Sequence, residues 1–270
     1  MKRAIKTLML KRMTIWRVPY ILSVKNKNRR MKTVLITGAN KGIGFETAKQ
    51  LAQLGYFVYL GSRDKAKGLD AINKLKDAGI STVELIELDV TDINSIKQAK
   101  QELETKIEVL DVLINNAGIS GERPQNASGI ELENVRRVFE TNFFGVIQTT
   151  QQFMSLLKKS DEPRIVNVSS ELGSLAIQSN PDSEFYDYKL TAYCSSKTAL
   201  NAFTVMLAYE FKDTNFKINS INPGYTETDF NQHRGTKSVA QSASLIVKYA
   251  TLENNGPTGK FYSEEGETAW

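Results

Sequence analysis

Tyr193 and Lys197 stand four residues apart in the segment AYCSSK, just before an apolar run with helical spacing. On a helix this spacing puts both side chains on one face, with Cβ atoms about 5–6 Å apart. An ammonium beside a phenol favours the phenolate, so we expect the pKa of Tyr193 to move from about 10 toward neutral pH. Such a tyrosine can give or take a proton, although a solvated helix face would show the same pair.

The composition limits the alternatives for acid–base chemistry. The chain has one histidine, His233, and one cysteine, Cys194. We therefore expect no disulfide framework, no metal site and no histidine-based triad, with His233 on the surface and Cys194 as a small helix residue. Chemistry is left to tyrosine, lysine, serine and carboxylates.

A glycine-rich turn, VLITGANKGIG, joins an apolar run to a helical pattern and contains Gly38, Gly42 and Gly44. Glycine permits a tight turn and a close approach of backbone N–H groups to a pyrophosphate, whose charge the helix N-terminus favours. The spacing GxxxGxG differs from the common GxGxxG pattern, but its place after the first strand favours dinucleotide binding.

The second apolar run ends in Gly61-Ser62-Arg63-Asp64. A carboxylate there selects NAD by accepting hydrogen bonds from the ribose hydroxyls. Here Ser62 and Arg63 can instead bind a 2′-phosphate, and Lys41 can add a second positive charge. Asp64 brings a carboxylate to the same place and so favours NAD(H), unless it serves as a helix N-cap. The pattern favours NADP(H) over NAD(H).

The elements that must position these residues alternate along the chain. Near-continuous apolar strands between amphipathic helices predict a parallel sheet covered on both faces. With right-handed crossovers this is an α/β, doubly wound (Rossmann) sheet of about seven strands in a single domain. The expected strands are 33–37, 57–60, 83–88, 112–115, 164–168, 217–222 and 259–262, and the expected helices are 43–54, 65–78, 93–106, 132–157, 198–211 and 239–250.

The formal net charge of +5 is unevenly distributed. Residues 1–30 hold ten Lys and Arg and no acid, and the remaining 25 basic residues face 30 acidic ones, a balance of −5. A nucleic-acid-binding function therefore loses its support. We expect residues 31–270 to be the catalytic domain and residues 1–30 to be upstream translation without fixed structure, or else a basic organelle presequence. Their apolar pieces are too short and too charged for a membrane span.

Five motifs occur together in order: TGANKGIG (37–44), NNAG (115–118), Ser170, Tyr193 with Lys197, and Pro223-Gly224. Together they resemble the short-chain dehydrogenase/reductase family, and TGANKGIG with GSRD is most similar to its NADPH-dependent carbonyl reductases. The resemblance covers residues 33 to about 262.

The resemblance implies a role for each catalytic position. Tyr193 would be the general acid that protonates the carbonyl oxygen as hydride arrives. Lys197 would lower the Tyr193 pKa and hold the nicotinamide ribose, and Ser170 would hydrogen-bond the substrate oxygen, with Ser169 as the alternative. Asn142 would bend its helix and order a water that leads to Lys197.

The resemblance also implies cofactor contacts along the whole cleft. Asp89 and Val90 would meet the adenine, and Thr228 the carboxamide, although the family more often has an apolar residue where Thr226 stands. The full set is Gly38, Asn40, Lys41, Gly42, Ile43, Gly44, Ser62, Arg63, Asp89, Val90, Asn116, Ala117, Gly118, Tyr193, Lys197, Pro223, Gly224 and Thr228.

One segment departs from compact members of the family. The stretch between Ser170 and Tyr193 is longer and includes LAIQSNPDSEFYDYKL. Its Phe185, Tyr186, Tyr188 and Leu190 would form an aromatic rim over the substrate cleft or pack the insertion down; both alternatives stay open. Longer insertions at this place accompany monomeric carbonyl reductases of the family, and the shorter insertion in this chain leaves monomer or homodimer open. Residues 225–238 would form a mobile lid.

The leading prediction is a cytoplasmic NADPH-dependent reductase of ketones, aldehydes or quinones. Its partners would be NADPH/NADP+ and a small-molecule carbonyl or alcohol, without nucleic acid or membrane. The alternatives are an NAD(P)-dependent secondary-alcohol dehydrogenase and a dinucleotide-sensing protein of the same fold. Sensors of this kind commonly lose the tyrosine or the lysine, and both are present here.

Overall fold

The computed structural model describes residues 30–270, and Met31–Trp270 forms one compact unit. The expectations for residues 1–30 lie outside the described residues, apart from Arg30. Within residues 30–270, no helix combines the length and the apolar character that crossing a bilayer requires.

The centre of the fold is a sheet with strand order β3-β2-β1-β4-β5-β6-β7-β8. All neighbouring strands are parallel except β7 and β8. The predicted doubly wound α/β class is therefore confirmed, with a short antiparallel eighth strand added. The strands are β1 (Thr33–Ile36), β2 (Phe57–Ser62), β3 (Val83–Glu87), β4 (Val112–Asn115), β5 (Arg164–Val168), β6 (Lys217–Ile221), β7 (Lys260–Ser263) and β8 (Gly266–Glu267).

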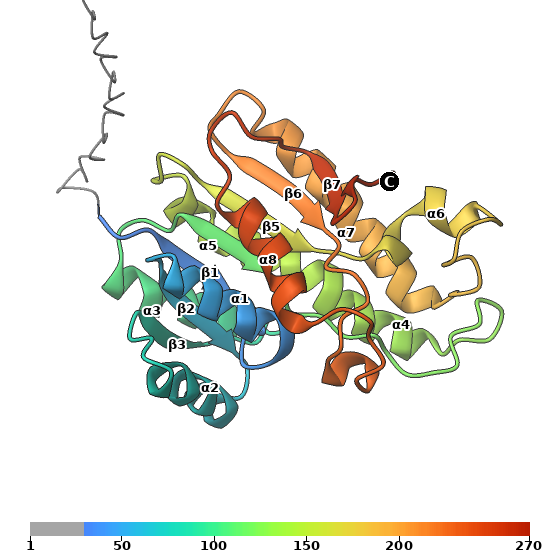
Figure 1. The fold of residues 1–270 in the computed structure, drawn as a ribbon, viewed down its shortest axis with the longest axis horizontal. Coiled ribbons are helices and arrows are strands. Elements are labelled where there is room, and N and C mark those ends of the chain that lie inside the picture. Colours follow the sequence, from blue (N-terminus) through green and yellow to red (C-terminus); the bar gives the residue numbers. More distant parts are fainter. Residues whose placement is uncertain (1–29) are drawn as a thin grey trace, which may run out of the picture. The chain divides into compact units, whose positions relative to one another are not determined.

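Helices cover both faces of this sheet, which explains the continuous apolar strands (Figure 1). In β1, Val34 and Ile36 pack into the core on one face, whereas Leu35 packs into the core on the other. One face carries α1 (Gly42–Gln53), α2 (Lys65–Asp77) and α8 (Val239–Ala250), and the other carries α3 (Ile93–Lys106), α5 (Gly145–Leu157) and α7 (Thr191–Glu210).

Two helices differ from the sequence-based expectation. The pattern over 132–157 forms α4 (Leu132–Phe139), a π-helical turn (Glu140–Phe144) and α5, so the helix changes geometry around Asn142. The helix expected from residue 198 begins at Thr191, and it therefore includes Tyr193. A short helix, α6 (Leu175–Ser179), lies in the insertion.

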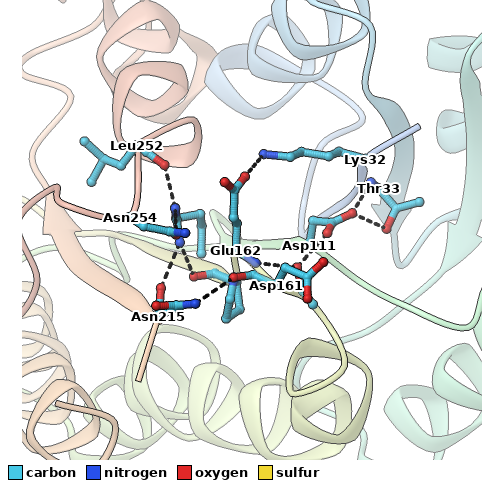
Figure 2. A network of polar contacts seen from close by, with 11 residues as sticks. Lys32, Thr33, Asp111, Asp161, Glu162, Asn215, Leu252 and Asn254 are labelled. Atoms are coloured by element: carbon cyan, nitrogen blue, oxygen red, sulfur yellow. Dashed lines mark hydrogen bonds and ion pairs between the residues drawn. The ribbon is translucent and has the colours of Figure 1, made fainter. Parts of the chain in front are cut away.

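A polar network connects residues at the amino-terminal ends of the central strands (Figure 2). The Arg164 side chain is 2% exposed, and its guanidinium donates to the carbonyl oxygens of Leu252 and Asn215 and to the Asn254 side chain. Because buried polar groups are stable only when hydrogen-bonded, this network holds β5 in register. The opposite end of β5 leads to Ser170.

Candidate active site

A large cleft lies at the carboxyl ends of the strands, where open α/β sheets bind ligands. Its volume is about 2770 Å³, well above the roughly 300–1,000 Å³ of common small-molecule pockets. There is room for a dinucleotide and a substrate together. Every predicted site residue except Ser62 and Asn142 lines the cleft: Gly38, Asn40, Lys41, Gly42, Ile43, Gly44, Arg63, Asp89, Val90, Asn116, Ala117, Gly118, Ser170, Tyr193, Lys197, Pro223, Gly224 and Thr228.

The glycine turn presents the uncapped start of α1 to the cleft. No side chain caps α1, and within residues 30–270 the N–H groups of Gly42, Ile43 and Gly44 have no hydrogen-bond partner. Orphan N–H groups at a helix N-terminus are suited to an anion. Gly38 has φ +61°, and a Cβ there would lie 2.9 Å from the Ala117 backbone. The turn fits a pyrophosphate.

Asn116 holds this turn in place, a role that the sequence did not indicate. Its Nδ2 donates to the carbonyl oxygens of Thr37 (2.9 Å) and Gly38 (3.0 Å). A Cβ on Gly44 would lie only 2.5 Å from that nitrogen. Gly44 is therefore required for the contact between α1 and the end of β4.

The segment at the end of β2 holds two of the residues expected to bind a 2′-phosphate, Ser62 and Arg63, with the carboxylate of Asp64 beside them. Ser62 is 1% exposed, and its hydroxyl donates to the Asp64 carbonyl oxygen, so it faces away from the cleft. Asp64 caps α2 by accepting from the Lys67 N–H at 3.0 Å, the structural alternative considered for it. Arg63 is exposed and lines the cleft, and no hydrogen bond or ion pair of its guanidinium is found among the described residues. The contact expected from Ser62 is thus not supported, whereas Arg63 fits a phosphate.

Tyr193, Lys197 and Ser170 meet at the other end of the cleft. The Lys197 Nζ lies 5.9 Å from the Tyr193 ring centroid and donates to the Val168 carbonyl oxygen at 2.7 Å. Ser170 follows β5 and is hydrogen-bonded to Tyr193. The three side chains come from α7 and from the segment after β5, which confirms that Tyr193 and Lys197 share a helix face.

The prediction that the pKa of Tyr193 is lowered is wrong for the protein without bound cofactor or substrate. Burial raises the pKa of Tyr193 to about 12, and the hydrogen bond with Ser170 offsets part of this effect. Burial also lowers the pKa of Lys197 to about 8. The physical reason is that both groups lose water while the Lys197 ammonium is directed to Val168. Tyr193 is consequently a neutral phenol at neutral pH, the protonation state of a proton donor.

The two candidate serines point in different directions. Ser169 also borders the cleft, but it is only 3% exposed and its hydroxyl is engaged, since it donates to Asn201 Oδ1 at 2.7 Å. Ser170 lines the cleft, and its Oγ accepts from the Leu172 N–H at 3.2 Å. This geometry favours Ser170 as the hydrogen-bond partner of a substrate oxygen.

Asn142 is fully buried in the π-helical turn. Its side chain accepts from the Ile119 N–H and donates to the Ile119 carbonyl oxygen, both at 2.9 Å. It also donates to Ser196 Oγ at 3.0 Å. A Cβ on Gly118 would lie 3.4 Å from Asn142 Oδ1 and 3.6 Å from Lys197 Nζ, so these two side chains flank Gly118. Asn142 thus links α7 to the end of β4.

The sequence of residues 32–238 matches the family model for short chain dehydrogenases. The chain belongs to this family. As a short-chain dehydrogenase it is an oxidoreductase that acts on CH–OH or C=O groups.

This short-chain dehydrogenase is similar to several plant enzymes over most of its length. It is 33% identical to a (+)-neomenthol dehydrogenase of Capsicum annuum, over 87% of this chain and 96% of that enzyme. It is 34% identical to a (-)-isopiperitenone reductase of Mentha piperita, over 86% and 96%. Its fold resembles that of the NADPH-bound carbonyl reductase from chicken fatty liver, with TM-score 0.76, 29% identity, and coverage of 90% of this chain and 100% of that one.

The insertion and the segment 225–238 both contribute residues to the lining of the cleft. Phe185, Tyr188 and Leu190 line the cleft, which supports the aromatic rim, whereas Tyr186 packs against Lys189. From the segment 225–238, the Phe230 ring lies 5.8 Å from the Tyr193 ring. His233 is exposed and lies 3.0 Å from Asp229, as expected for a surface residue.

Sequence reasoning missed Glu171, which directly follows Ser170 and lines the cleft. Burial raises the pKa of its carboxyl, and a hydrogen bond with Asn222 opposes that change. Glu171 belongs to no sequence motif that predicts a site residue, so only the folded structure shows that it lines the cleft.

Proposed function

We propose that this short-chain dehydrogenase is an NADPH-dependent reductase that transfers hydride to the carbonyl of a ketone, aldehyde or quinone, with Tyr193 as the proton donor. The observation that carries the proposal is the arrangement along one cleft. Tyr193, Ser170 and Lys197 lie at one end, and the α1 N-terminus and Arg63 lie at the other.

The cofactor choice is supported by the charges at the end of β2. Within residues 30–270 the Arg63 guanidinium has no hydrogen-bond or ion-pair partner, and the Asp64 carboxylate is engaged at the N-terminus of α2 and with Lys67. A guanidinium binds phosphate oxygens through two parallel hydrogen bonds. The NADPH-bound carbonyl reductase among the structural neighbours points the same way.

The chemistry follows from the protonation states of the residues. When bound, the nicotinamide supplies the hydride. Ser170 donates a hydrogen bond to the substrate oxygen and stabilises the charge that develops there. Tyr193, a neutral phenol, transfers its proton to that oxygen. Lys197, with a pKa near 8, places a positive charge next to the phenolate that forms.

The names of the relatives support a ketone or its alcohol as the substrate pair, since they include a menthol-type dehydrogenase and a reductase. The aromatic rim of Phe185 and Tyr188 fits an apolar substrate. A purely sensing role is disfavoured because the tyrosine, the lysine and the serine of the mechanism all occur together.

The test is a screen of NADPH oxidation across ketones, aldehydes and quinones, followed by Tyr193→Phe on the best substrate. We expect the variant to bind NADPH as the wild type does and to lose about 10²–10⁴-fold in kcat, the usual contribution of a positioned acid. Turnover of Tyr193→Phe near the wild-type rate would overturn the assignment.

A further inference from the structure

The helix that carries Tyr193 begins without a cap of its own. Its N-cap residue is Leu190, whose side chain makes no capping hydrogen bond. The first N–H groups of an α-helix have no partner within the helix and need one from elsewhere. In α7 these include the N–H groups of Thr191, Ala192 and Tyr193 itself.

One distant residue, Gln125, supplies the partner for all three. Its backbone carbonyl accepts from the Thr191 N–H at 3.3 Å and from Thr191 Oγ1 at 2.7 Å. Its side-chain Oε1 accepts from the N–H groups of Ala192 (3.1 Å) and Tyr193 (3.3 Å). Gln125 is 3% exposed, so water does not replace these bonds.

The other end of the Gln125 side chain holds the loop after β4. Its Nε2 donates to the Ser120 carbonyl oxygen at 2.7 Å. Gly121 provides the space, because it has φ +77° and a Cβ there would lie 3.1 Å from Nε2. The preceding residue, Ile119, is held by Asn142 on both its N–H and its carbonyl.

We propose that Gln125 is a positioning residue for Tyr193: it is a helix cap from a distant part of the same chain, and it ties the first turn of α7 to Ser120 in the loop after β4. Gln125 does not line the large cleft, so it acts through Tyr193 and not on the substrate. Tyr193 is the third residue of α7, within the turn that Gln125 caps. Lys197 lies one turn further on and is held independently by Val168.

This inference rests on the proposed function for its kinetic readout. Loss of the cap frees the first turn of α7, which moves the phenol but leaves Lys197 and the cofactor cleft in place. A displacement of about 1 Å in a reacting group can cost on the order of 10²-fold in rate. The signature is therefore a fall in kcat without a fall in NADPH affinity.

The test compares three variants of the full chain. Gln125→Met keeps the length of the side chain and removes its polar atoms, so we expect kcat to fall about 10- to 100-fold with the NADPH Kd within about twofold. Gln125→Glu keeps an oxygen that accepts from Ala192 and Tyr193 and complements the helix N-terminus, so it should recover most of kcat. Asn219→Leu removes a buried amide that bridges Pro257 and Lys260 and makes no hydrogen bond with Gln125 or with the first turn of α7, so it should keep kcat.

The proposal is overturned if folded Gln125→Met keeps wild-type kcat, if Gln125→Glu is as impaired as Gln125→Met, or if Asn219→Leu loses kcat equally. Should Gln125→Met fail to fold, Thr191→Val removes one hydrogen bond to Gln125, and an unchanged kcat there counts against the proposal.

Hydrogen–deuterium exchange separates this inference from the proposed function, since it needs no substrate. Faster exchange of residues 191–193 in Gln125→Met or Thr191→Val than in the wild type, with exchange near the wild-type rate in Gln125→Glu, supports the cap even if no carbonyl is reduced. A wild type that reduces carbonyls, together with unchanged exchange and kcat in these variants, refutes the cap alone.

Discussion

The Lys41 ammonium lies 2.9 Å from the Asp229 carboxylate, and this ion pair joins the glycine turn to the segment 225–238. Asp229 also contacts His233, and its hydrogen bonds with Lys41 and, to a smaller extent, with His233 hold the pKa of the Asp229 carboxyl below the ordinary value. The next residue, Phe230, packs against Tyr193. The same short segment thus contacts both Lys41 of the glycine turn and Tyr193, and Lys41 has an anionic partner within the protein itself.

The Lys41–Asp229 pair predicts that Asp229 competes with the 2′-phosphate of NADPH. Asp229→Asn should tighten NADPH binding by about two- to fivefold at low ionic strength, a modest effect because both side chains are exposed. NADH affinity should not change. Fluorescence titration measures both, and Glu227→Gln is the matched control, since it removes the same charge from the same segment. An equal effect of both variants would point to overall charge instead.

We expect Arg63 to give the protein its preference for NADPH over NADH by binding the 2′-phosphate. Arg63→Ala is expected to weaken NADPH by roughly tenfold or more, because it removes a charge-assisted, two-pronged contact. The NADH Kd should stay within about twofold. Lys65→Ala is the control, since Lys65 is exposed near Arg63 but does not line the cleft. Equal losses for the two cofactors would show that Arg63 does not contact a 2′-phosphate.

The sequence was sufficient for the features that depend on local pattern. Strands buried on both faces read as apolar runs, as in β1, and glycines such as Gly38 and Gly44 mark places where backbones approach closely. Residues that line the cleft could therefore be assigned to strand ends from the order of these patterns along the chain.

Other features depend on residues far apart in the chain. The start of α7 was missed because its cap, Gln125, lies 67 positions before Ala192. The direction of the Tyr193 pKa was missed because burial, a tertiary property, outweighs its neighbour four residues away. The contact expected from Ser62 is not supported because its hydroxyl donates to a carbonyl close in the chain, that of Asp64.

Lys197 gives a pH dependence whose sign can be worked out. Its folded-state pKa of about 8 lies below the ordinary 10.5. Between these values the unfolded chain holds a proton that the folded chain releases, so the free energy of unfolding rises with pH. Above pH 10 the raised Tyr193 pKa acts in the opposite direction, which limits the useful window to pH 8–10.

The variant Lys197→Met has no titrating amine at this position, so comparison with the wild type isolates the contribution of Lys197 to the pH dependence of stability. From pH 8 to 10 the free energy of unfolding of the wild type should increase by about 2 kcal/mol relative to that of the variant. Urea unfolding at steps of pH measures both proteins, and the other titrating groups cancel in the difference. A difference that does not vary with pH would mean that the amine keeps its ordinary pKa in the folded chain.

The two neighbouring serines give the sharpest matched pair. Ser170→Ala should lower kcat by about 10²-fold, because it removes the donor to the developing oxyanion, while thermal stability stays near that of the wild type. Ser169→Ala leaves Asn201 Oδ1 buried without its donor, so it should cost about 1–3 kcal/mol of stability and leave kcat largely intact. Steady-state kinetics and urea unfolding on both variants test this. The reverse pattern, with kcat lost in Ser169→Ala and retained in Ser170→Ala, would exchange the roles of the two residues, because it would mean that the Ser169 hydroxyl leaves Asn201 Oδ1 to serve the substrate.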